Sequence, residues 1–330
     1  MNLKIIQAGI LDSVQDNGRL GYRHLGINPG GCMDQHATSI ANSLVGNDFN
    51  EAVIEMHFPA AEFLFEEPAL IAVAGADFSP TINGKPVPLC HPVLVDANSM
   101  LQFKRSISGA RAYLAIRGGI KIFPWLSSYS TNLQVSAGGF QGRKLMRYDG
   151  LPYQPIENAD ALLNGNDFLV LSWFATNGHA YLNNDAVLVL PGKEWDQLSG
   201  VSKNDFLQNS FTISKQADRM GYQLDGVNLN TEIQNDLVST AVNAGTIQVL
   251  PNGKLIILMA DHQVTGGYPR VAHVFSAQLP RLAQMSPGEQ VQFRLTDQLH
   301  AENLFCKQQQ DLQQLQNACK LKLDEFFKVQ

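Results

Sequence analysis

The sequence predicts a mainly β protein with two related β units, a few helices and an amphipathic C-terminal helix. Three segments of the first half recur in the same order in the second half: Arg-x-Gly-Tyr at 19–22 and 219–222, an apolar run ending at Asp77 and at Asp261, and a strand-like run ending at Phe103 and at Phe293. Their separation of roughly 190 residues is typical of a duplicated domain and too long for a solenoid repeat. At 330 residues the chain also exceeds the size of one comfortable core, which favours two domains.

Short strands account for most of the first unit. Runs such as EAVIEMHF, ALIAVAGADF and ARAYLAIRGG have apolar or alternating patterns, and Gly, Pro, Asn and Asp separate them. Asn83-Gly84 is typical of a type I′ hairpin turn, because both residues tolerate a positive φ angle. One helix is predicted at 34–45, where Asp34 suits the N-cap and Gly46 suits the stop.

The chain from 119 to 186 differs in composition. It is rich in Gly, Ser and Asn and shows little periodicity, as in SSYSTNLQVSAGGFQGRKL. We therefore predict a first β unit at 1–118, an ordered connecting excursion with a few strands at 119–186, and a second β unit with the C-terminal helix at 187–330. A loop as long as this excursion is usually functional.

The tail from 297 to 327 predicts an amphipathic helix. Its apolar side chains fall on one helical face, with Gln and Lys opposite: Phe305, Leu312, Leu315, Cys319, Leu323 and Phe326. Packing against the chain's own β unit is the expected use of this face, and a contact with another protomer is the alternative.

Charge and composition disfavour several classes of protein. The net charge is −6 without a basic run, which disfavours binding to nucleic acid or to an anionic membrane. No stretch approaches the roughly 18 apolar residues of a membrane span, and the first residues lack the apolar core of a signal peptide. We therefore expect a soluble, cytoplasmic protein. The four Cys are scattered and no His spacing is typical of a metal site, which predicts reduced thiols and no metal.

The segment that begins at Asp261 is the best candidate for chemistry. An apolar run, LIILMA, leads to Asp261, and a polar loop with Thr265, Gly266, Gly267 and Tyr268 follows. Backbone N–H groups on a Gly-Gly turn can form an anion-binding nest, and Asp261 can act as a base or hold an N–H group. The structural alternative is a loop that needs its glycines for geometry alone. No Walker A loop or G-x-S-x-G elbow offers a competing site.

The two Arg-x-Gly-Tyr segments supply further candidates. Arg219 and Tyr222 would line the same pocket as Asp261, and Arg19 and Tyr22 would form the corresponding set in the first unit. An Arg beside a Gly-containing turn can grip a carboxylate or phosphate with two hydrogen bonds. The alternative is that a nearby acid pairs with each Arg and pins the turn.

Several segments together resemble the biotin-dependent carboxyltransferase-like family over nearly the whole chain. They are VQDNGRLGYRHLGINPGGCMD, ANSLVGN, YLAIRGG, QADRMGYQLDG, GTIQVLPNGKLIILMADHQVTGGYPRVA and AQMSPGEQVQF. The family includes the C subunit of bacterial 5-oxoprolinase, the regulator KipA, allophanate hydrolase subunit 2 and part of urea carboxylase. The resemblance implies two cyclophilin-like β-barrel domains, in agreement with the duplication. The chain departs from the family at 128–131, Ser-Tyr-Ser-Thr, where an Arg is usual.

The resemblance also implies a function in a complex. The chain would be the C subunit of an ATP-dependent 5-oxoprolinase, an amide (lactam) hydrolase that opens 5-oxoproline to glutamate. Its partners would be a KipI-like B subunit and a LamB/YcsF-like A subunit, and ATP would be used together with them. No Met-Lys-Met biotin-attachment sequence is present, so any biotin carrier would be another chain. In this interpretation Asp261 is the catalytic residue and the other candidates bind the lactam or amide substrate.

Two alternatives stay open at this point. The first is a carboxyltransferase component that moves a carboxyl group from carboxybiotin to urea or a related amide, which a neighbouring gene for biotin carboxylase would favour. The second is a non-enzymatic regulator like KipA that binds a KipI-like inhibitor of a kinase. Tight binding to such a partner without turnover of any amide would favour the second.

Overall fold

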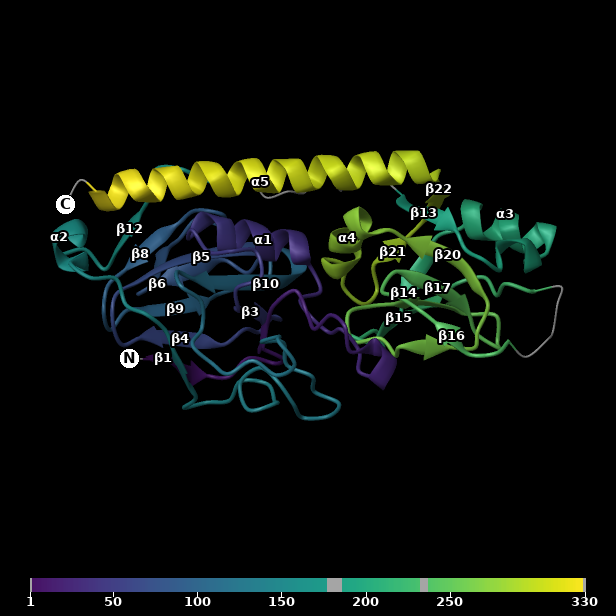
Figure 1. Ribbon diagram of the computed structural model, residues 1–330, viewed down its shortest axis with the longest axis horizontal. Helices are drawn as coiled ribbons and strands as arrows, with labels where there is room; N and C mark the ends of the chain where they lie inside the picture. The colour runs from purple at the N-terminus through teal and green to yellow at the C-terminus, as the bar shows by residue number, and fades with distance from the viewer. Residues whose placement is uncertain (1, 177–185, 232–236, 329–330) are drawn as a thin grey trace. The chain divides into compact units, whose positions relative to one another are not determined.

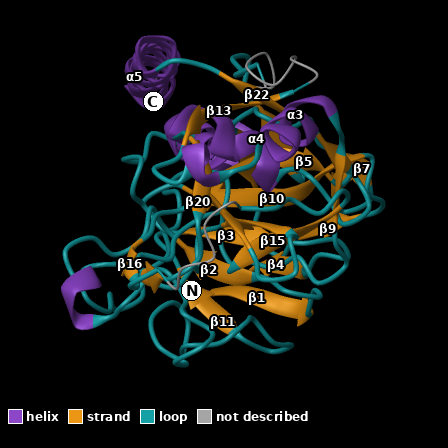
Figure 2. Ribbon diagram, turned by 90° about the vertical axis from the view of Figure 1, so that its right-hand side faces the viewer, coloured by secondary structure: helices purple, strands orange, loops and turns teal. Residues whose placement is uncertain are grey.

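The computed structural model describes residues 2–176, 186–231 and 237–328. The chain divides into two compact units. Unit 1 comprises Met1–Arg19, Asp34–His179 and Gln310–Gln330, and unit 2 comprises Leu20–Met33 and Ala180–Gln309. Strands form most of the regular structure, so the prediction of a mainly β protein is confirmed (Figures 1 and 2).

Unit 1 is built from antiparallel sheets. One sheet has the order β11-β1-β4-β9-β6-β7 and contains β1 (Asn2–Gln7), β4 (Glu62–Phe65), β6 (Pro80–Ile82), β7 (Lys85–Pro86), β9 (Met100–Phe103) and β11 (Gly150–Pro152). Another has the order β12-β8-β5-β10-β3-β2 and contains β2 (Ser13–Gln15), β3 (Val53–Met56), β5 (Ala69–Asp77), β8 (Val93–Val95), β10 (Ser108–Ile116) and β12 (Phe168–Val170).

Both sheets of unit 1 contribute to one apolar core. Leu3 and Phe63 come from the first sheet, and Ile54, Val73 and Leu114 come from the second. The alternation expected for half-buried strands is visible in β1, where Leu3 and Ile5 are buried between less buried neighbours. The type I′ hairpin is confirmed, because Asn83 and Gly84 have φ angles of 48° and 80° and join β6 to β7.

The predicted helix of unit 1 is α1 (Gln35–Leu44), which packs on β5 and β10 (Figure 1). The Asp34 side chain accepts a hydrogen bond from the backbone N–H of Ala37 at 2.8 Å, so the predicted N-cap is confirmed. A short helix, α2 (Ala159–Leu163), lies in the excursion, and a 3₁₀ turn, η1 (Arg23–Leu25), belongs to the segment of unit 2 that precedes α1 in the chain.

Unit 2 is organised around one larger sheet. Its order is β21-β14-β15-β18-β17-β20-β13-β22, with β13 (Val187–Pro191), β14 (Phe211–Ile213), β15 (Gly221–Asp225), β17 (Thr246–Val249), β18 (Leu255–Leu258), β20 (Arg270–Val274), β21 (Gln290–Val291) and β22 (Phe293–Leu295). A small pairing of β16 (Thr240–Ala241) with β19 (Thr265–Gly266) accompanies it. The helical segments are η3 (Trp195–Gln197), α3 (Gly200–Gln208), η4 (Ser276–Gln278) and α4 (Leu279–Ala283).

The C-terminal helix is α5 (Gln298–Lys328), as the apolar periodicity predicts. Leu312, Cys319 and Leu323 are buried, and Gln316 donates from its side-chain amide to the backbone carbonyl of Asn47 at 3.1 Å. This face therefore packs within the chain, but from Gln310 onward it packs on unit 1 and not on the second β unit with which the helix was predicted. Phe305 is an exception at 41% exposure, because Ala301 and Gln308 occupy the buried positions in that part of the helix.

The compact units differ from the predicted boundaries in three places. Leu20–Met33 belongs to unit 2, residues 119–176 of the excursion belong to unit 1, and α5 is divided after Gln309. The reason for the second difference is strand pairing, since β11 pairs with β1 and β12 pairs with β8. The excursion thus supplies an edge strand to each sheet of unit 1.

Candidate functional site

A buried ion pair is the central feature of the candidate site in unit 2. The chain leaves β18 and turns through Asp261, whose backbone N–H donates to the carbonyl of Arg219 at 2.7 Å. The Arg219 side chain returns to the same residue. Its Nε lies 2.8 Å from Oδ2 of Asp261 and its Nη2 lies 3.1 Å from Oδ1. Arg219 and Asp261 are 5% and 7% exposed, so this two-point pair is largely shielded from water.

The same pair anchors the segment that precedes α1 in sequence. Nη2 of Arg219 donates to the carbonyl of Gly31 at 2.6 Å, and the side-chain amide of Asn28 donates to the carbonyl of Asp261 at 3.0 Å. Met33, further along, is part of the apolar core of unit 2. A substrate would have to compete with Arg219 for the Asp261 carboxylate, so the observed geometry suits holding the 28–31 segment better than free proton abstraction.

The Thr-Gly-Gly loop does not form the predicted nest. Neither Gly266 nor Gly267 has a positive φ angle, and Thr265 and Gly266 form β19, which is paired with β16. A nest needs successive N–H groups that converge on one point, which this extended backbone does not provide. Gly266 is closely packed, because an added Cβ would lie 2.7 Å from Nε2 of the buried Gln248 side chain, which would have to shift. The structural alternative, in which the loop needs its glycines for geometry alone, therefore describes this loop better than an anion-binding nest.

The remaining predicted residues of unit 2 have different environments. Thr265 is exposed and Tyr268 is 41% exposed, so both hydroxyl groups are open to solvent in the unit described. Tyr222 is 1% exposed and packs within the apolar core of unit 2, on β15. The buried position of Tyr222 does not suit contact with a substrate.

Arg19 and Tyr22, the candidate set predicted for the first unit, are assigned to different compact units. Arg19 belongs to unit 1, and Tyr22 belongs to the 20–33 segment of unit 2, where it precedes η1. Arg19 is 1% exposed, donates from Nη2 to the carbonyl of Ser130, and has its guanidinium 4.6 Å from the ring centroid of Trp125. In unit 1 the motif arginine holds a loop of the excursion.

A second buried network surrounds Asp16, which is fully buried. Its Oδ1 accepts hydrogen bonds from the hydroxyl groups of Ser128 and Ser130 at 2.7 and 2.6 Å and from the N–H of Gly18 at 2.7 Å. Its Oδ2 accepts from the N–H of Tyr129 at 2.6 Å. Sequence analysis missed this network, in which Ser128, Tyr129 and Ser130 are more than a hundred residues from Asp16. The only signal was the hydroxyl-rich Ser-Tyr-Ser-Thr run itself.

Sequence analysis also missed two buried titratable groups. Burial raises the pKa of Asp12 to about 7, although its carboxylate accepts hydrogen bonds from the N–H groups of Ala61 at 2.6 Å and His57 at 3.2 Å. In unit 2, burial lowers the pKa of His262, which favours the neutral ring at pH 7. Beside it Arg23 donates to the carbonyl of Val242 and to Oδ1 of Asn243.

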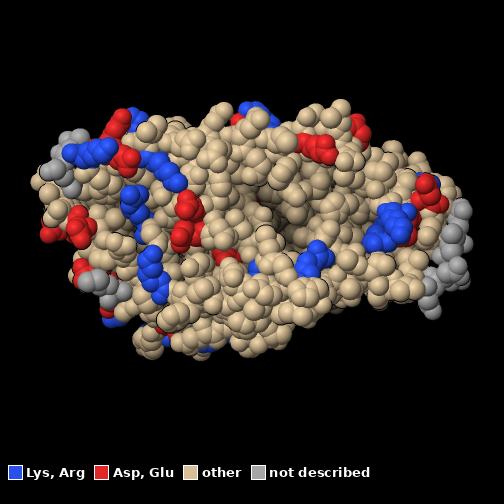
Figure 3. Space-filling model, in the orientation of Figure 1, with Lys and Arg blue, Asp and Glu red and all other residues tan. Residues whose placement is uncertain are grey.

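Charge and metal-binding capacity set limits on what the described residues can bind. On the face drawn in Figure 3, basic and acidic side chains are interspersed and most of the surface carries neither. Among the described residues, no group of three or more His, Cys, Asp or Glu side chains is placed to hold a metal ion. The four Cys are free thiols, and no helix in the described ranges is long and apolar enough to span a membrane.

Comparison with known proteins gives the family of the chain. Residues 25–295 match the family described as "Carboxyltransferase domain, subdomain A and B". The chain is 35% identical to the 5-oxoprolinase C subunit of Escherichia coli, over 88% of this chain and 90% of the relative. It is 33% identical to the 5-oxoprolinase C subunit of Haemophilus influenzae, over 92% of this chain and 94% of the relative.

A solved structure agrees with these sequence relatives. The urea amidolyase of K. lactis superposes with a TM-score of 0.84 at 25% identity, over 95% of this chain and 20% of that larger chain. The matched residues include parts of both compact units. The chain therefore belongs to the carboxyltransferase-domain family that also contains the bacterial 5-oxoprolinase C subunits.

Proposed function

We propose that this chain is the C subunit of an ATP-dependent 5-oxoprolinase. The observation that carries the proposal is the end-to-end match with two relatives of that name, each covered over nearly its whole length. The urea amidolyase match also covers most of this chain, but it corresponds to a small part of a larger protein. The two 5-oxoprolinase C subunits are therefore relatives that this chain matches along nearly their whole length, unlike the urea amidolyase.

The chemistry of the substrate explains why such a subunit would work in a complex. An unactivated lactam is a poor electrophile, and phosphorylation of its amide oxygen makes the ring carbon easier to attack. ATP would therefore be a substrate of the assembled enzyme. This chain has no Walker A loop, so in this proposal a KipI-like B subunit and a LamB/YcsF-like A subunit share the work of binding ATP and completing hydrolysis.

Within unit 2, we place the substrate-binding surface at the loop that follows Asp261. Thr265 and Tyr268 offer exposed hydroxyl groups, and the Arg219–Asp261 pair fixes the backbone from which the loop starts. Asp261 remains the predicted acid of this surface. To act as a base, its carboxylate would have to release Arg219 and contact the substrate instead. Arg219 would otherwise position the loop and would not touch the substrate.

The experiment that tests the proposal is reconstitution. The purified chain would be assayed for release of glutamate from 5-oxoproline, alone and with candidate B and A subunits, with and without ATP. We expect no release by the chain alone and ATP-dependent release by the full set. A folded full set that releases no glutamate from 5-oxoproline contradicts the proposal.

A second candidate function is carboxyl transfer to urea or a related amide, which the urea amidolyase match favours. Both reactions handle a small planar amide, so one surface could serve either. The same purified chain would be incubated with a biotin carboxylase, a biotinylated carrier, bicarbonate, ATP and urea. Urea-dependent consumption of carboxybiotin, together with no glutamate release from 5-oxoproline, would select this second function.

A further inference from the structure

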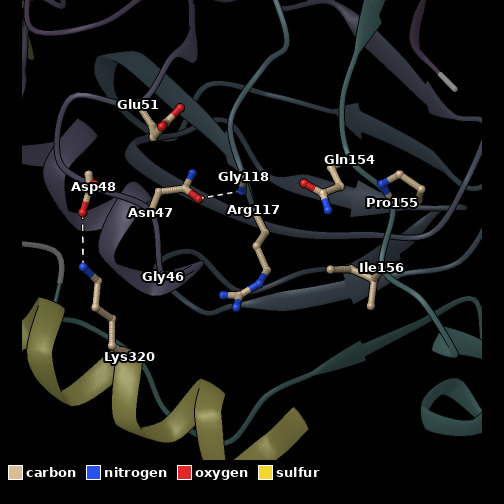
Figure 4. A pocket seen from close by; sticks show the side chains of 10 residues that line it. All are labelled: Gly46, Asn47, Asp48, Glu51, Arg117, Gly118, Gln154, Pro155, Ile156 and Lys320. Carbon is tan, nitrogen blue, oxygen red and sulfur yellow. Dashed lines mark hydrogen bonds and ion pairs between the residues drawn. The ribbon is translucent and has the colours of Figure 1, made fainter.

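Unit 1 contains a polar cavity that none of the predicted site residues lines. Its volume is about 520 Å³, within the range of small-molecule sites. Its walls come from the end of α1, the end of β10, the chain after β11, and α5 (Figure 4). The lining residues are Gly46, Asn47, Asp48, Glu51, Arg117, Gly118, Gln154, Pro155, Ile156 and Lys320, all in unit 1.

A fully bonded asparagine makes the floor of this cavity rigid. The Asn47 side chain accepts from the N–H of Gly118 at 2.7 Å and donates to the carbonyl of Ile116 at 2.8 Å and to Oδ1 of Asn42 at 3.0 Å. Its backbone carbonyl accepts from Gln316 of α5. Asn47 therefore joins three elements at one point, and its amide is not available to a ligand.

Glycine backbone lies next to the charged side chains around the cavity. Gly46 and Gly118 have φ angles of 77° and 78°, a conformation that favours glycine. A Cβ on Gly46 would lie 2.6 Å from Nη1 of Arg117, and a Cβ on the adjacent Gly119 would lie 2.1 Å from Oε2 of Glu51. Both charged side chains therefore lie directly against glycine backbone, at positions where a larger residue would displace them.

Two of the four charged side chains around the cavity, Arg117 and Glu51, form no ion pair within the described residues. Lys320 and Asp48 form an exposed ion pair at 3.2 Å (Figure 4). Arg117 donates from Nη1 to the carbonyl of Val45 at 2.8 Å and stacks over Phe327, but within the described residues it makes no ion pair. Glu51 has no hydrogen bond or ion pair from its carboxylate to any described residue. Burial lowers the pKa of Arg117, and the charge of Asp324 on α5 acts in the opposite direction.

Arg117 and Glu51 are both half-buried and both line this cavity, but they do not bond to each other. A ligand that fits them would carry a negative group for Arg117 and a positive group for Glu51. In the view of Figure 4, Glu51 and the Arg117 guanidinium lie on opposite sides of the Asn47–Gly118 hydrogen bond. We propose that this cavity binds a small zwitterionic α-amino acid, with its carboxylate on Arg117 and its ammonium group on Glu51. The exposed side-chain amide of Gln154 is available for the polar end of the ligand.

Calorimetric titration of the full chain alone tests this proposal, with L-glutamate as the probe. L-glutamate is chosen because it is the product of the proposed reaction, but the class of ligand follows from the cavity. Glutarate lacks the ammonium group, and isoglutamine lacks the α-carboxylate. We expect saturable binding of L-glutamate and at least about tenfold weaker binding of both analogues, since each loses a charge-assisted contact.

Variants assign the binding to the cavity. Arg117→Gln and Glu51→Gln should each weaken L-glutamate binding about tenfold or more, and the exposed Arg105→Gln should leave it unchanged. If Arg117→Gln unfolds through loss of its bond to Val45, Glu51→Gln still decides, because its carboxylate bonds to no described residue. No binding at about 10 mM, equal binding of glutarate, or binding unaffected by a folded Glu51→Gln would overturn the proposal.

The outcome can be separated from that of the proposed function. The titration uses the chain alone, so absence of glutamate release by the complex does not affect it. In an active complex, Arg117→Gln should weaken L-glutamate binding and leave the rate of 5-oxoproline cleavage without added glutamate unchanged. Loss of that basal rate in a folded variant would show that the cavity is part of the reaction site and would overturn the assignment of a separate amino-acid site.

Discussion

Replacing Asp261 by Asn should destabilise unit 2 strongly. The change leaves the Arg219 guanidinium 5% exposed and without its anionic partner, next to the Gly31 carbonyl. Breaking a buried pair by removing one member costs about 3–5 kcal/mol, because the remaining charge is left in a poorly hydrated place. For a domain of roughly this size, 1 kcal/mol lowers the melting temperature by about 2–4 °C, so we expect a decrease of about 6–20 °C.

Two comparison variants make this experiment specific. Asp225 pairs with Lys254 at 2.7 Å in the same unit, but its side chain is 50% exposed, so Asp225→Asn should cost no more than about 1 kcal/mol. A double variant, Arg219→Met with Asp261→Leu, removes both charges and should regain much of the stability lost in the single variant. Thermal melting and urea unfolding of the full chain supply the measurements.

Hydrogen exchange would locate the effect of Asp261→Asn. Because Arg219 and Asp261 together hold Asn28 and Gly31, faster exchange is expected in the 28–31 segment and not in α1. A variant that melts within about 2 °C of the wild type and yet abolishes the activity of the assembled complex would refute this reasoning. Such a result would return Asp261 to the role of a catalytic acid whose pair with Arg219 is weak.

Three further predictions concern unit 1. Because burial raises the pKa of Asp12 to about 7, the native state binds this proton more tightly than the unfolded chain does. The stabilisation from this group is therefore fully present below about pH 4 and is lost as the pH rises to about 7. Urea unfolding should show the wild type losing stability between about pH 4 and 7, by up to about 4 kcal/mol, and Asp12→Asn losing much less. Asp16→Ala removes four hydrogen bonds to one carboxylate and should cost at least about 3 kcal/mol and expose 128–142 to limited proteolysis, and a stable, protease-resistant variant would contradict that network. Gly138→Ala should also destabilise unit 1, because its Cβ would lie 2.3 Å from the Ser130 carbonyl, whereas Gly165→Ala, which has a positive φ angle but open space, should cost only about 1 kcal/mol by thermal melting.

Local rules predicted the elements that local interactions form. Asp34 caps α1 through an N–H three residues away, and Asn83-Gly84 closes a hairpin through its own φ angles. The apolar stripe of α5 is also a property of the segment alone, and only Phe305 deviates from it. In each case the deciding interaction lies within a few residues, where sequence spacing fixes geometry.

Partners distant in sequence were not predictable in the same way. Asp16 and Ser130 are 114 residues apart, and Arg219 and Gly31 are 188 apart. No pattern in either segment specifies the other, because the contact depends on which strands pair. Likewise, a glycine at position 266 is compatible with an anion-binding nest or with an extended strand. The pairing of β19 with β16 makes it part of a strand.

The two Arg-x-Gly-Tyr segments make one comparable kind of contact and differ in another. Arg19 and Arg219 are both almost fully buried, and each donates to a backbone carbonyl of a distant segment, Ser130 or Gly31. In unit 2 an acid, Asp261, completes the arrangement, whereas Arg19 has the Trp125 ring beside it. A buried guanidinium has five hydrogen-bond donors in fixed positions, so it is well suited to holding such a segment in place. Since each copy holds a backbone carbonyl of a distant segment in place, the property that the two motifs share in the described residues is structural.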